Sequence, residues 1–384
     1  MSNPIILPPA MLGMLGGGQL GRFFVIAAHE MGYRVTVLDP DKNSPAGKIA
    51  DVHLCAAYDD QAALEQMAKS CEAVTTEFEN VPASTLEYLA QSRIVRPAAS
   101  AVSVAQHRVM EKNFIRDSGL PVAPFAVIKQ VGDIPADGSD VYPAILKVAR
   151  FGYDGKGQAR VANSKEALAA FDAFKQEECV LEKMLALDYE VSVVLARGSD
   201  GVIASFPTAE NSHLNGILDI SIIPARAPEH IHGQAHQLAM QLAEKLDYVG
   251  VLAVEFFVSD GKLVVNEMAP RPHNSGHYTI DACVTNQFEQ QVRALVGLSL
   301  GDARMHSYAV MVNILGDIWY GTDDQVAEPH WDYILANPRL KLHLYGKHEA
   351  RKGRKMGHFT LLDRDVETAV VLATEARSSL GIGD

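Results

Sequence analysis

The chain has 384 residues, of which 48% are hydrophobic and 21% are charged, and at about 100 to 200 residues per domain this length predicts three domains. The share of apolar residues is enough to form packed cores and argues against a disordered chain. The net charge of −13 disfavours general nucleic-acid binding, so an anionic ligand needs a helix N-terminus or a local cluster of Lys and Arg.

Cysteine spacing and apolar runs predict a cytoplasmic protein. The four cysteines lie far apart without a C-x-x-C pair, which disfavours a zinc site and a disulfide framework and fits a reducing compartment. The apolar stretch 5–15 holds two prolines and follows no basic residue, so we interpret it as the approach to a first strand and not as a signal peptide. No uncharged apolar run approaches the roughly 18 residues of a membrane-spanning helix.

Residues 1–105 predict a Rossmann-like α/β domain. Short apolar segments alternate with helical patterns, which is typical of an open parallel sheet. We expect strands at 11–15, 34–38, 73–76 and 93–95, and helices at 23–31, 61–69 and 83–91.

A glycine loop connects the first strand to the first helix. Its pattern Gly16-x-Gly18-x-x-Gly21 matches the dinucleotide fingerprint, and Asp39 stands near the end of the second strand, so an NAD-dependent dehydrogenase is one interpretation. Glycines at a helix N-terminus also let backbone N–H groups approach a monophosphate, and they can form a tight turn without any ligand. The loop indicates a phosphate and leaves these alternatives open.

Residues 106–304 predict an α+β unit with a mobile part at about residues 125–190. After a helix at 108–118 and a strand at 125–128, Lys147 lies on a strand at 144–148, and a loop with three glycines follows it. Such a loop can cover a triphosphate while Lys147 supplies a fixed positive charge, although an exposed hairpin loop is the alternative. It is not a P-loop, because Gly-Lys-Ser/Thr is missing. The loop consists of Gly152, Tyr153, Asp154, Gly155, Lys156, Gly157 and Gln158.

Two glutamates occupy neighbouring strands of a predicted hairpin that turns at Asp260-Gly261. Glu255 and Glu267 lie among apolar residues, where a cation stabilises a carboxylate, so we expect them to bind Mg²⁺ together with ATP phosphates. A two-residue turn would place Glu255 opposite Asn266 and Glu267 on the other face. Shared ligation therefore requires an odd-length loop or a β-bulge, and solvent-facing carboxylates are the alternative.

Two further groups of donors can hold anions. Arg271, His273 and Asn274 follow Glu267 in a loop stiffened by Pro and Gly, where Arg can grip bicarbonate bidentately, although a plain polar loop is possible. Residues 305–384 predict a small β-rich tail with strands at 340–345 and 357–362. The tail also holds a basic cluster, which is a candidate phosphate receptor or a solvated face. Its members are Lys347, Arg351, Lys352, Arg354 and Lys355.

Together these motifs resemble a known family. Lys147, the loop 152–158, Glu190, Glu255 and Asn266-Glu267 are similar to the ATP-grasp superfamily, in which two lobes close on Mg-ATP. Essentially end to end, the chain resembles the N5-carboxyaminoimidazole ribonucleotide synthetases. The segments that carry the likeness are 16–21, 77–82, 152–158, 266–276, 344–347 and 351–358. The resemblance implies an ATP-grasp fold, part α/β and part α+β, with a Rossmann-like N-terminal domain and a small β-rich C-terminal domain.

The resemblance also implies an activity and the residues that carry it. It predicts an ATP-dependent carbon–nitrogen ligase of purine biosynthesis, which carboxylates 5-aminoimidazole ribonucleotide with bicarbonate through carboxyphosphate. Glu255 and Glu267 would hold Mg²⁺, or Mn²⁺ in its place. The implied catalytic residues are Arg271, His273, Asn274, Asp154 and Lys147. The implied ATP-binding residues are the loop 152–158 with Arg108, Lys147, Glu182, Lys183, Met184, Leu185, Glu190, His213, Asn266 and Glu267. The implied substrate-binding residues are Gly18, Gln19, Leu20, Glu77, Tyr153, Asp154, Ser275, Lys347, Arg354 and Lys355.

Partners and rival functions complete the expectations. The resemblance implies a homodimer with functional coupling to the N5-carboxyaminoimidazole ribonucleotide mutase, without nucleic-acid or membrane partners. A formate-dependent glycinamide ribonucleotide transformylase would share both glycine loops. An NAD-dependent dehydrogenase would explain only the N-terminal segment, and a non-catalytic binding protein would have no use for the glutamate pair.

Overall fold

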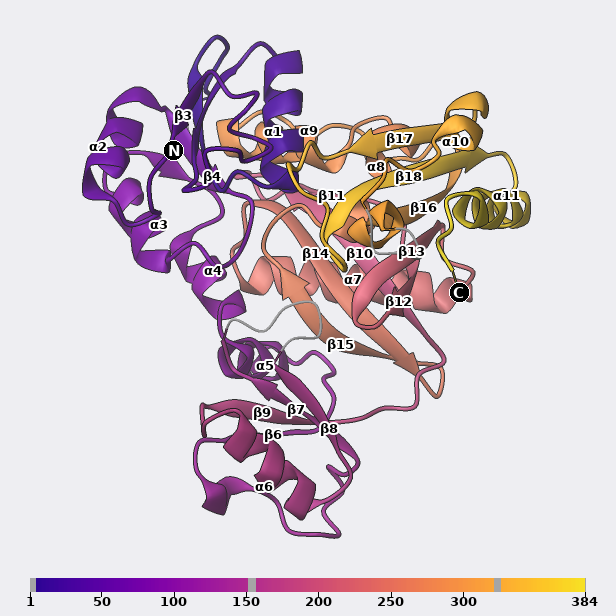
Figure 1. Cartoon of the computed structure of the whole chain (residues 1–384). Helices are drawn as coiled ribbons and strands as arrows, with labels where there is room; N and C mark the ends of the chain where they lie inside the picture. The colour runs from indigo at the N-terminus through magenta and orange to yellow at the C-terminus, as the bar shows by residue number, and fades with distance from the viewer. Residues whose placement is uncertain (1–4, 151–156, 321–325, 384) are drawn as a thin grey trace.

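The computed structural model describes residues 5–150, 157–320 and 326–383. In Figure 1 the N-terminal domain lies at the upper left, a lobe built on a small sheet projects downwards, and a large sheet runs across to the C-terminal helix on the right. No helix within these ranges is long and apolar enough to cross a membrane.

The N-terminal domain is a parallel sheet of five described strands in the order β3-β2-β1-β4-β5. Strands β1, β2 and β4 are almost wholly buried, as expected of parallel strands covered on both faces. The predicted strands and helices of this domain are therefore confirmed. Its elements are β1 (Met11–Leu15), α1 (Gln19–Glu30), β2 (Arg34–Leu38), β3 (Val52–Leu54), α2 (Gln61–Ser70), β4 (Ala73–Thr76), α3 (Ala83–Ala90), β5 (Ile94–Val95) and α4 (Ala99–Ala105).

The projecting lobe is an antiparallel sheet of four described strands in the order β6-β9-β7-β8. Helix α6 covers one face and buries Phe171 and Ala167 against the sheet, while the side chain of Asn163 caps the N-terminus of this helix. Helix α5 leads into the lobe. The elements are α5 (Arg108–Asp117), β6 (Phe125–Ile128), η1 (Val131–Asp133), β7 (Ala144–Val148), β8 (Gln158–Val161), α6 (Ser164–Ala173) and β9 (Cys179–Lys183).

The strands in the rest of the described chain form one sheet of nine strands, in the order β15-β14-β10-β12-β13-β16-β18-β17 with β11 beside β10. Because β16 pairs with β13, the C-terminal strands extend this sheet across the predicted boundary at residue 304, and the division of the chain at residues 105 and 304 stays a prediction. The strands are β10 (Tyr189–Arg197), β11 (Ile203–Ser205), β12 (Ala209–Leu214), β13 (Ile217–Ile223), β14 (Gly250–Ser259), β15 (Lys262–Ala269), β16 (Tyr308–Leu315), β17 (Leu340–Leu344) and β18 (Lys355–Asp363). The helices are α7 (Glu229–Lys245), η2 (Asn274–Gly276), α8 (Thr279–Ala282), α9 (Gln287–Val296), η3 (Gly316–Trp319), α10 (Asp332–Ala336) and α11 (Val366–Ser379).

The β14–β15 hairpin contains the predicted bulge. Asp260 and Gly261 form a two-residue turn with φ of 50° and 66°, which is typical of a type I′ turn. Pairing is regular as far as Phe256 with Val265 and then shifts, so that Glu255 lies opposite Glu267. Asn266 is the extra residue of this bulge. The bulge, and not a longer loop, therefore brings the two glutamates to matching positions.

Helix α9 shares a hydrophobic core with the N-terminal domain. The ring of Phe288 lies 5.0 Å from that of Phe23 on α1, and Leu295 packs in the same cluster. The buried guanidinium of Arg96 donates hydrogen bonds to the carbonyl oxygens of Ala294 and Leu295, at 2.7 and 2.9 Å. These are terminal carbonyls of α9, where a positive charge is favourable. The first domain is thus fastened to the large sheet by packing and by a buried cation.

Candidate active site

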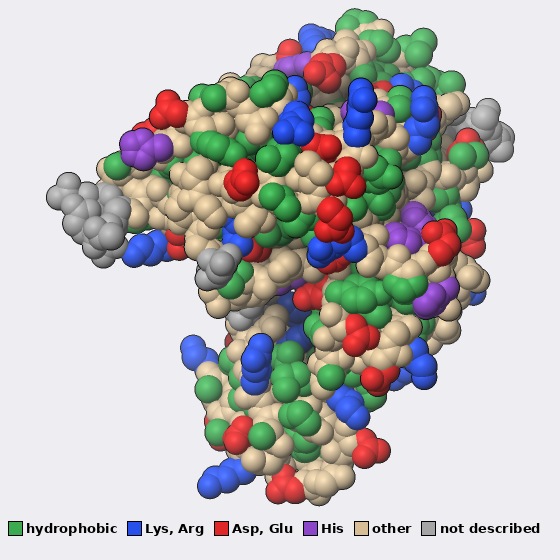
Figure 2. Space-filling model, turned by 90° about the vertical axis from the view of Figure 1, so that its right-hand side faces the viewer, with side chains coloured by type: hydrophobic (Ala, Val, Ile, Leu, Met, Phe, Trp, Pro, Cys, Tyr) green, Lys and Arg blue, Asp and Glu red, His purple; other side chains and the backbone are tan. Residues whose placement is uncertain are grey.

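A cavity of about 1060 Å³ lies where the N-terminal domain, the projecting lobe and the nine-stranded sheet meet. Figure 2 shows the molecule hollowed between the lobe and the body, with Lys and Arg side chains on the inner wall. Most of the described residues that the sequence predicted for the site line this cavity. They are Gly18, Gln19, Leu20, Glu77, Arg108, Lys147, Gln158, Glu190, His213, Glu255, Asn266, Glu267, Arg271, His273, Asn274, Lys347, Arg354 and Lys355.

The remaining predicted site residues fall into two groups. The first group is described but lies outside the residues that line the cavity: Gly157, Glu182, Lys183, Met184, Leu185 and Ser275. The second group lies outside the described residues: Gly152, Tyr153, Asp154, Gly155 and Lys156. Their assignment to ATP and to the ribonucleotide stays a prediction.

The glycine loop holds a carboxylate of the protein itself. The N–H groups of Gly18 and Gly21 donate to the two oxygens of Glu77, and the Gly21 bond measures 2.6 Å. Gly17 donates to Asp39 at 2.7 Å, and Asp39 also accepts from the hydroxyl of Tyr58. The anion at this helix N-terminus is therefore Glu77, whereas the loop pattern alone suggested a phosphate, because glycine spacing does not specify which anion comes to the N–H groups.

Two opposing effects act on the pKa of the Glu77 carboxyl group. Burial raises its pKa, while the hydrogen bonds from Gly21 and Gly18 act in the opposite direction. Because Asp39 is engaged by the loop and by Tyr58, it is not presented to a dinucleotide ribose as the fingerprint requires. The geometry therefore disfavours the dehydrogenase interpretation.

Lys147 reaches the cavity from β7 and is held by Glu182 on the neighbouring strand β9. The Lys147 Nζ donates to Glu182 Oε2 at 2.9 Å, and Lys112 Nζ donates to Glu182 Oε1 at 2.7 Å. Burial alone would raise the pKa of Glu182, but the charges of both lysines hold it at about 2. Burial also lowers the pKa of Lys147, although Glu182 opposes this shift. The carboxylate of Glu182 thus orients the lysine expected to contact phosphate.

Glu255 and Glu267 face the cavity from the bulged hairpin. Burial, together with the negative charge of Glu267, raises the pKa of Glu255 to about 7. Arg108 Nη1 lies 3.5 Å from Glu267 Oε2, and His273 Nε2 lies 3.6 Å from Glu255 Oε1. Two carboxylates that repel each other at a cavity wall fit a divalent cation, and Mg²⁺ prefers a pair of carboxylates that leave room for phosphate oxygens.

The anion loop, residues 271–277, places three donors beside this pair. Arg271 is fixed by an ion pair with Glu79 in the N-terminal domain, with Nε 2.6 Å from Oε2. Burial would raise the pKa of Glu79, but the Arg271 charge and hydrogen bond leave it lowered, so the pair is ionised. Within the described chain, neither the Oδ1 nor the Nδ2 of buried Asn274 has a protein partner. Asn274 lines the cavity, so an amide whose hydrogen-bonding capacity is not used by the described protein atoms lies beside the glutamate pair.

His273 is neutral and presents an N–H to the cavity. Burial lowers its pKa well below the usual value, and the Arg271 charge lowers it further. Its Nδ1 accepts from the backbone N–H of Ser275 at 3.3 Å, which leaves Nε2 as the protonated nitrogen in the neutral ring. His273 can therefore donate a hydrogen bond to an anion. The hydroxyl of Ser275 lies 2.9 Å from His273 Nδ1 and accepts a hydrogen bond from the hydroxyl of Ser192 at 2.9 Å.

Glu190 and His213 form an ion pair on neighbouring strands β10 and β12, with Oε2 3.0 Å from Nδ1. Burial would lower the pKa of His213, but the bond to Glu190 raises it overall. Both side chains lie at the cavity wall, where the resemblance predicted contacts with ATP. The pair offers a carboxylate and an imidazole to a ribose or a phosphate.

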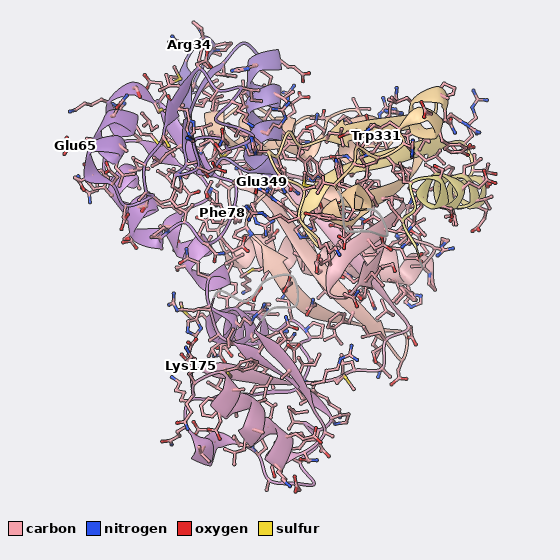
Figure 3. The ribbon with its side chains drawn as sticks, in the orientation of Figure 1. Arg34, Glu65, Phe78, Lys175, Trp331 and Glu349 are labelled. Atoms are coloured by element: carbon pink, nitrogen blue, oxygen red, sulfur yellow. The ribbon has the colours of Figure 1, made fainter. Side chains whose placement is uncertain are left out.

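The basic cluster meets the N-terminal domain. Lys347 Nζ donates to Gln19 Oε1 at 2.7 Å, and a smaller cavity of about 170 Å³ is lined by Lys347, Arg351 and Arg354. In Figure 3, Phe78 and Glu349 come from opposite ends of the chain yet both lie near the middle of the molecule, whereas Lys175 lies in the projecting lobe. Lys347, Arg354 and Lys355 of the cluster line the large cavity, whereas Arg351 and Lys352 do not, and the phosphate-binding role of the cluster stays a prediction.

Three charged residues of the site were missed by the sequence analysis. Glu79 belongs to the motif 77–82 but received no role, although its place in a segment that carries the family resemblance was a usable signal. Glu111 and Lys112 lie on α5 and are 4% and 3% exposed. Burial raises the pKa of Glu111 to about 8, with a further contribution from the charge of Glu267. Charged residues in a helix usually face solvent, so nothing in the local pattern marked these two.

Three family matches cover most of the chain. Residues 10–106 match the ribonucleotide synthetase preATP-grasp domain, residues 113–288 the ATP-grasp domain, and residues 309–370 the phosphoribosylaminoimidazole carboxylase C-terminal domain. The predicted fold class, an ATP-grasp domain between a Rossmann-like domain and a C-terminal domain, is confirmed.

Known proteins resemble the chain along its length. The N5-carboxyaminoimidazole ribonucleotide synthase of Bacillus subtilis (strain 168) is 42% identical over 364 residues, 94% of each chain. A crystal structure of an N5-carboxyaminoimidazole ribonucleotide synthetase with ADP has a TM-score of 0.90 and 41% identity, covering 99% of this chain and 98% of that one. The Aspergillus clavatus N5-carboxyaminoimidazole synthase, in complex with ADP and 5-aminoimidazole ribonucleotide, has a TM-score of 0.87 and 30% identity, covering 99% and 100%. The chain therefore belongs to the N5-carboxyaminoimidazole ribonucleotide synthetase family of ATP-grasp ligases.

Proposed function

We infer that this protein is an ATP-dependent ligase that carboxylates the exocyclic amine of 5-aminoimidazole ribonucleotide with bicarbonate in purine biosynthesis. The products are N5-carboxyaminoimidazole ribonucleotide, ADP and phosphate. The observation that carries this conclusion is a single cavity lined by Lys147, the Glu255–Glu267 pair, three residues of the anion loop and three of the basic cluster, namely Arg271, His273, Asn274, Lys347, Arg354 and Lys355. This cavity could bind the triphosphate of ATP, the small anion bicarbonate and the phosphate of the ribonucleotide side by side.

The first chemical step activates bicarbonate. Bicarbonate is a weak electrophile, so transfer of the γ-phosphoryl group of ATP to its oxygen forms carboxyphosphate and releases ADP. Lys147 binds the phosphates as a fixed charge, and Arg271 binds the anion through a planar pair of donors. His273 and Asn274 complete the anion site as hydrogen-bond donors.

The second step forms the carbon–nitrogen bond. The amine attacks carboxyphosphate, or CO₂ released from it in the closed site, and phosphate leaves while the amine loses a proton. Asp154, which lies outside the described residues, and His273 are the two predicted candidates for assisting this proton transfer. Glu77 and the basic cluster hold the ribonucleotide at the edge of the N-terminal domain.

Glu255 and Glu267 are the residues that would hold Mg²⁺, with Mn²⁺ as a substitute, and Asn266 stands beside them. An ion held by these residues would supply positive charge beside the phosphates. Support for this assignment comes from the raised pKa of Glu255 and from the matching positions of the two carboxylates.

The proposed function is tested by measuring ADP release with 5-aminoimidazole ribonucleotide present, with and without bicarbonate. Release that depends on both substrates supports the proposal, and release indifferent to bicarbonate contradicts it. Product analysis with labelled bicarbonate against labelled formate separates it from the transformylase alternative. NAD is also added to the protein, and no change of absorbance in the NADH range would exclude the dehydrogenase alternative.

Three further assignments stay predictions. We propose a homodimer, functional coupling to the mutase that consumes the product, and a cytoplasmic location. Sedimentation of the purified chain tests the first. Transfer of product to the mutase in competition with a trapping reagent tests the second, and localisation of a tagged chain tests the third.

A further inference from the structure

The bulge at Asn266 places two glutamates together, but a bulge also interrupts the hydrogen-bond ladder of its strand. The backbone around this bulge is bonded by side chains of helix α5. The carbonyl oxygen of Asn266 accepts from Lys112 Nζ at 2.8 Å, and the N–H of Met268 donates to Glu111 Oε1 at 2.7 Å. Glu267 lies between these two residues, so its backbone is held on both sides by one helix.

The two α5 side chains are buried, at 4% exposure for Glu111 and 3% for Lys112. Burying charged groups is costly unless each one finds polar partners, and here the partners are backbone atoms of the metal-bearing strand. An apolar pair would fill the same space without that cost. The two charged side chains therefore supply hydrogen bonds to the backbone of β15 that apolar packing could not supply.

Lys112 also bonds a second catalytic element. Its Nζ donates to Glu182 Oε1 at 2.7 Å, and the other oxygen of Glu182 holds Lys147 at 2.9 Å. Glu182 and Lys147 belong to the projecting lobe, whereas Asn266 belongs to the large sheet. One ammonium group thus connects the phosphate-binding lysine of the lobe to the bulge of the carboxylate hairpin.

We propose that Glu111 and Lys112 are positioning residues, which hold the Asn266 bulge so that Glu267 faces Glu255 and which set Lys147 at a fixed place relative to that pair. This proposal rests on the proposed function, because it takes the glutamate pair as the site of a divalent ion bound with nucleotide. Neither residue needs to touch substrate. Their effect is on the geometry of groups that do.

The proposal is tested by titrating Mn²⁺ into the full chain with ADP present, with free Mn²⁺ followed by electron paramagnetic resonance. Lys112→Met removes both hydrogen bonds, and we expect the Mn²⁺ dissociation constant to rise about 10-fold to 100-fold, as when a residue behind a metal ligand is lost. Lys112→Arg keeps donors and charge and should recover most of the affinity. Lys129→Met is the matched control, because Lys129 lies in the same lobe in an exposed ion pair with Glu178.

Variants of Glu111 provide a second, independent test, which remains informative if Lys112→Met fails to fold. Glu111→Gln keeps an oxygen that can accept from Met268, whereas Glu111→Ala does not. We expect weakened Mn²⁺ binding in the alanine variant and near-normal binding in the glutamine variant. In turnover, the Mg²⁺ concentration at half-maximal rate should rise while the KM for the ribonucleotide stays unchanged, which a general loss of stability would not produce.

Equal Mn²⁺ affinity, within twofold, in folded Lys112→Met or Glu111→Ala and in the unaltered protein would overturn the proposal. This outcome is distinct from failure of the proposed function. If the unaltered chain binds Mn²⁺ with ADP but shows no bicarbonate-dependent turnover, the reaction is misassigned, and the binding comparison still decides whether α5 positions the metal pair.

Discussion

Arg271 and Glu79 form a partly buried ion pair in which the guanidinium of the anion loop is held by a carboxylate of the N-terminal domain. The pair fixes the direction of the guanidinium before any ligand binds. The Nε atom of Arg271 donates to Glu79, its Nη1 atom donates to the carbonyl oxygen of Pro272 at 3.2 Å, and the side chain lines the cavity. Preorganised donors of this kind are effective because they need no rearrangement during the reaction.

Replacing Arg271 with lysine should lower kcat by about 100-fold or more, since the planar donor pair is lost although the charge remains. Steady-state rates at saturating ATP and bicarbonate measure the effect. Arg304→Lys is the control, because Arg304 is exposed and its guanidinium forms an ion pair with Asp302, two positions earlier in the chain. A fall of less than threefold in the Arg271 variant would contradict the role given to its guanidinium.

Lys147→Met should lower kcat by about 100-fold or more, because a fixed positive charge near the transferred phosphoryl group is removed. ADP binding should weaken less than turnover if the lysine acts mainly on the transition state. Isothermal titration with ADP and measurement of turnover separate the two. The exposed Lys165 on α6 provides the control variant Lys165→Met, which should behave like the unaltered protein.

Glu182 should make stability depend on pH at the acid end. Burial would raise its pKa, but Lys147 and Lys112 hold it at about 2, below the ordinary 4.5. A folded pKa below the unfolded one contributes stability above the unfolded pKa, and this contribution is lost as the pH falls from about 4.5 towards 2. Urea unfolding between pH 5 and pH 3 should therefore give a steeper loss of free energy for the unaltered protein than for Glu182→Gln.

The same variant should also be less stable at neutral pH. Removing one partner of a buried ionic group leaves Lys112 and Lys147 without their shared carboxylate, at a cost of about 3 to 5 kcal/mol. An unfolding free energy at pH 7 equal to that of the unaltered protein, or parallel pH slopes for the two proteins, would show that Glu182 does not carry the charge described.

Arg354→Ala should raise the KM for the ribonucleotide by about tenfold and leave the KM for ATP unchanged, since one charge-assisted contact to a phosphate is lost. The KM of the unaltered protein should also rise with salt, because electrostatic contacts at an open site are screened. Arg364→Ala changes an exposed arginine after β18 and serves as the control. An unchanged KM for the ribonucleotide in Arg354→Ala would end its assignment to the phosphate site.

The carboxylate pair was within reach of sequence reasoning because strand geometry is strict. A side-chain period of two means that Glu255 and Glu267 cannot meet across a two-residue turn without one extra residue, so a bulge was predictable. The position of that residue at Asn266 was not, because the energy that favours it comes from Glu111 and Lys112 on a helix more than 150 positions away.

Other features depended on contacts that no local pattern encodes. The glycine loop reveals an anion site at a helix N-terminus, but only the folded chain shows that Glu77 fills it. Strand β16 has the same composition whether it begins a separate tail or extends the large sheet. Its pairing with β13 decides between these possibilities, and the partner lies far away in the chain.

The buried bond between Arg96 and the end of α9 bears on attempts to dissect the protein. A fragment that stops after α4 would lose Phe288 and Leu295 from its own interior and would leave the Arg96 guanidinium without carbonyl partners. Such a fragment would expose the apolar surface that normally packs against α9, with the Arg96 side chain within it. Expression trials that cut the chain at residue 105 should therefore yield aggregates, whereas circular permutants that keep α9 with the first sheet should remain dispersed.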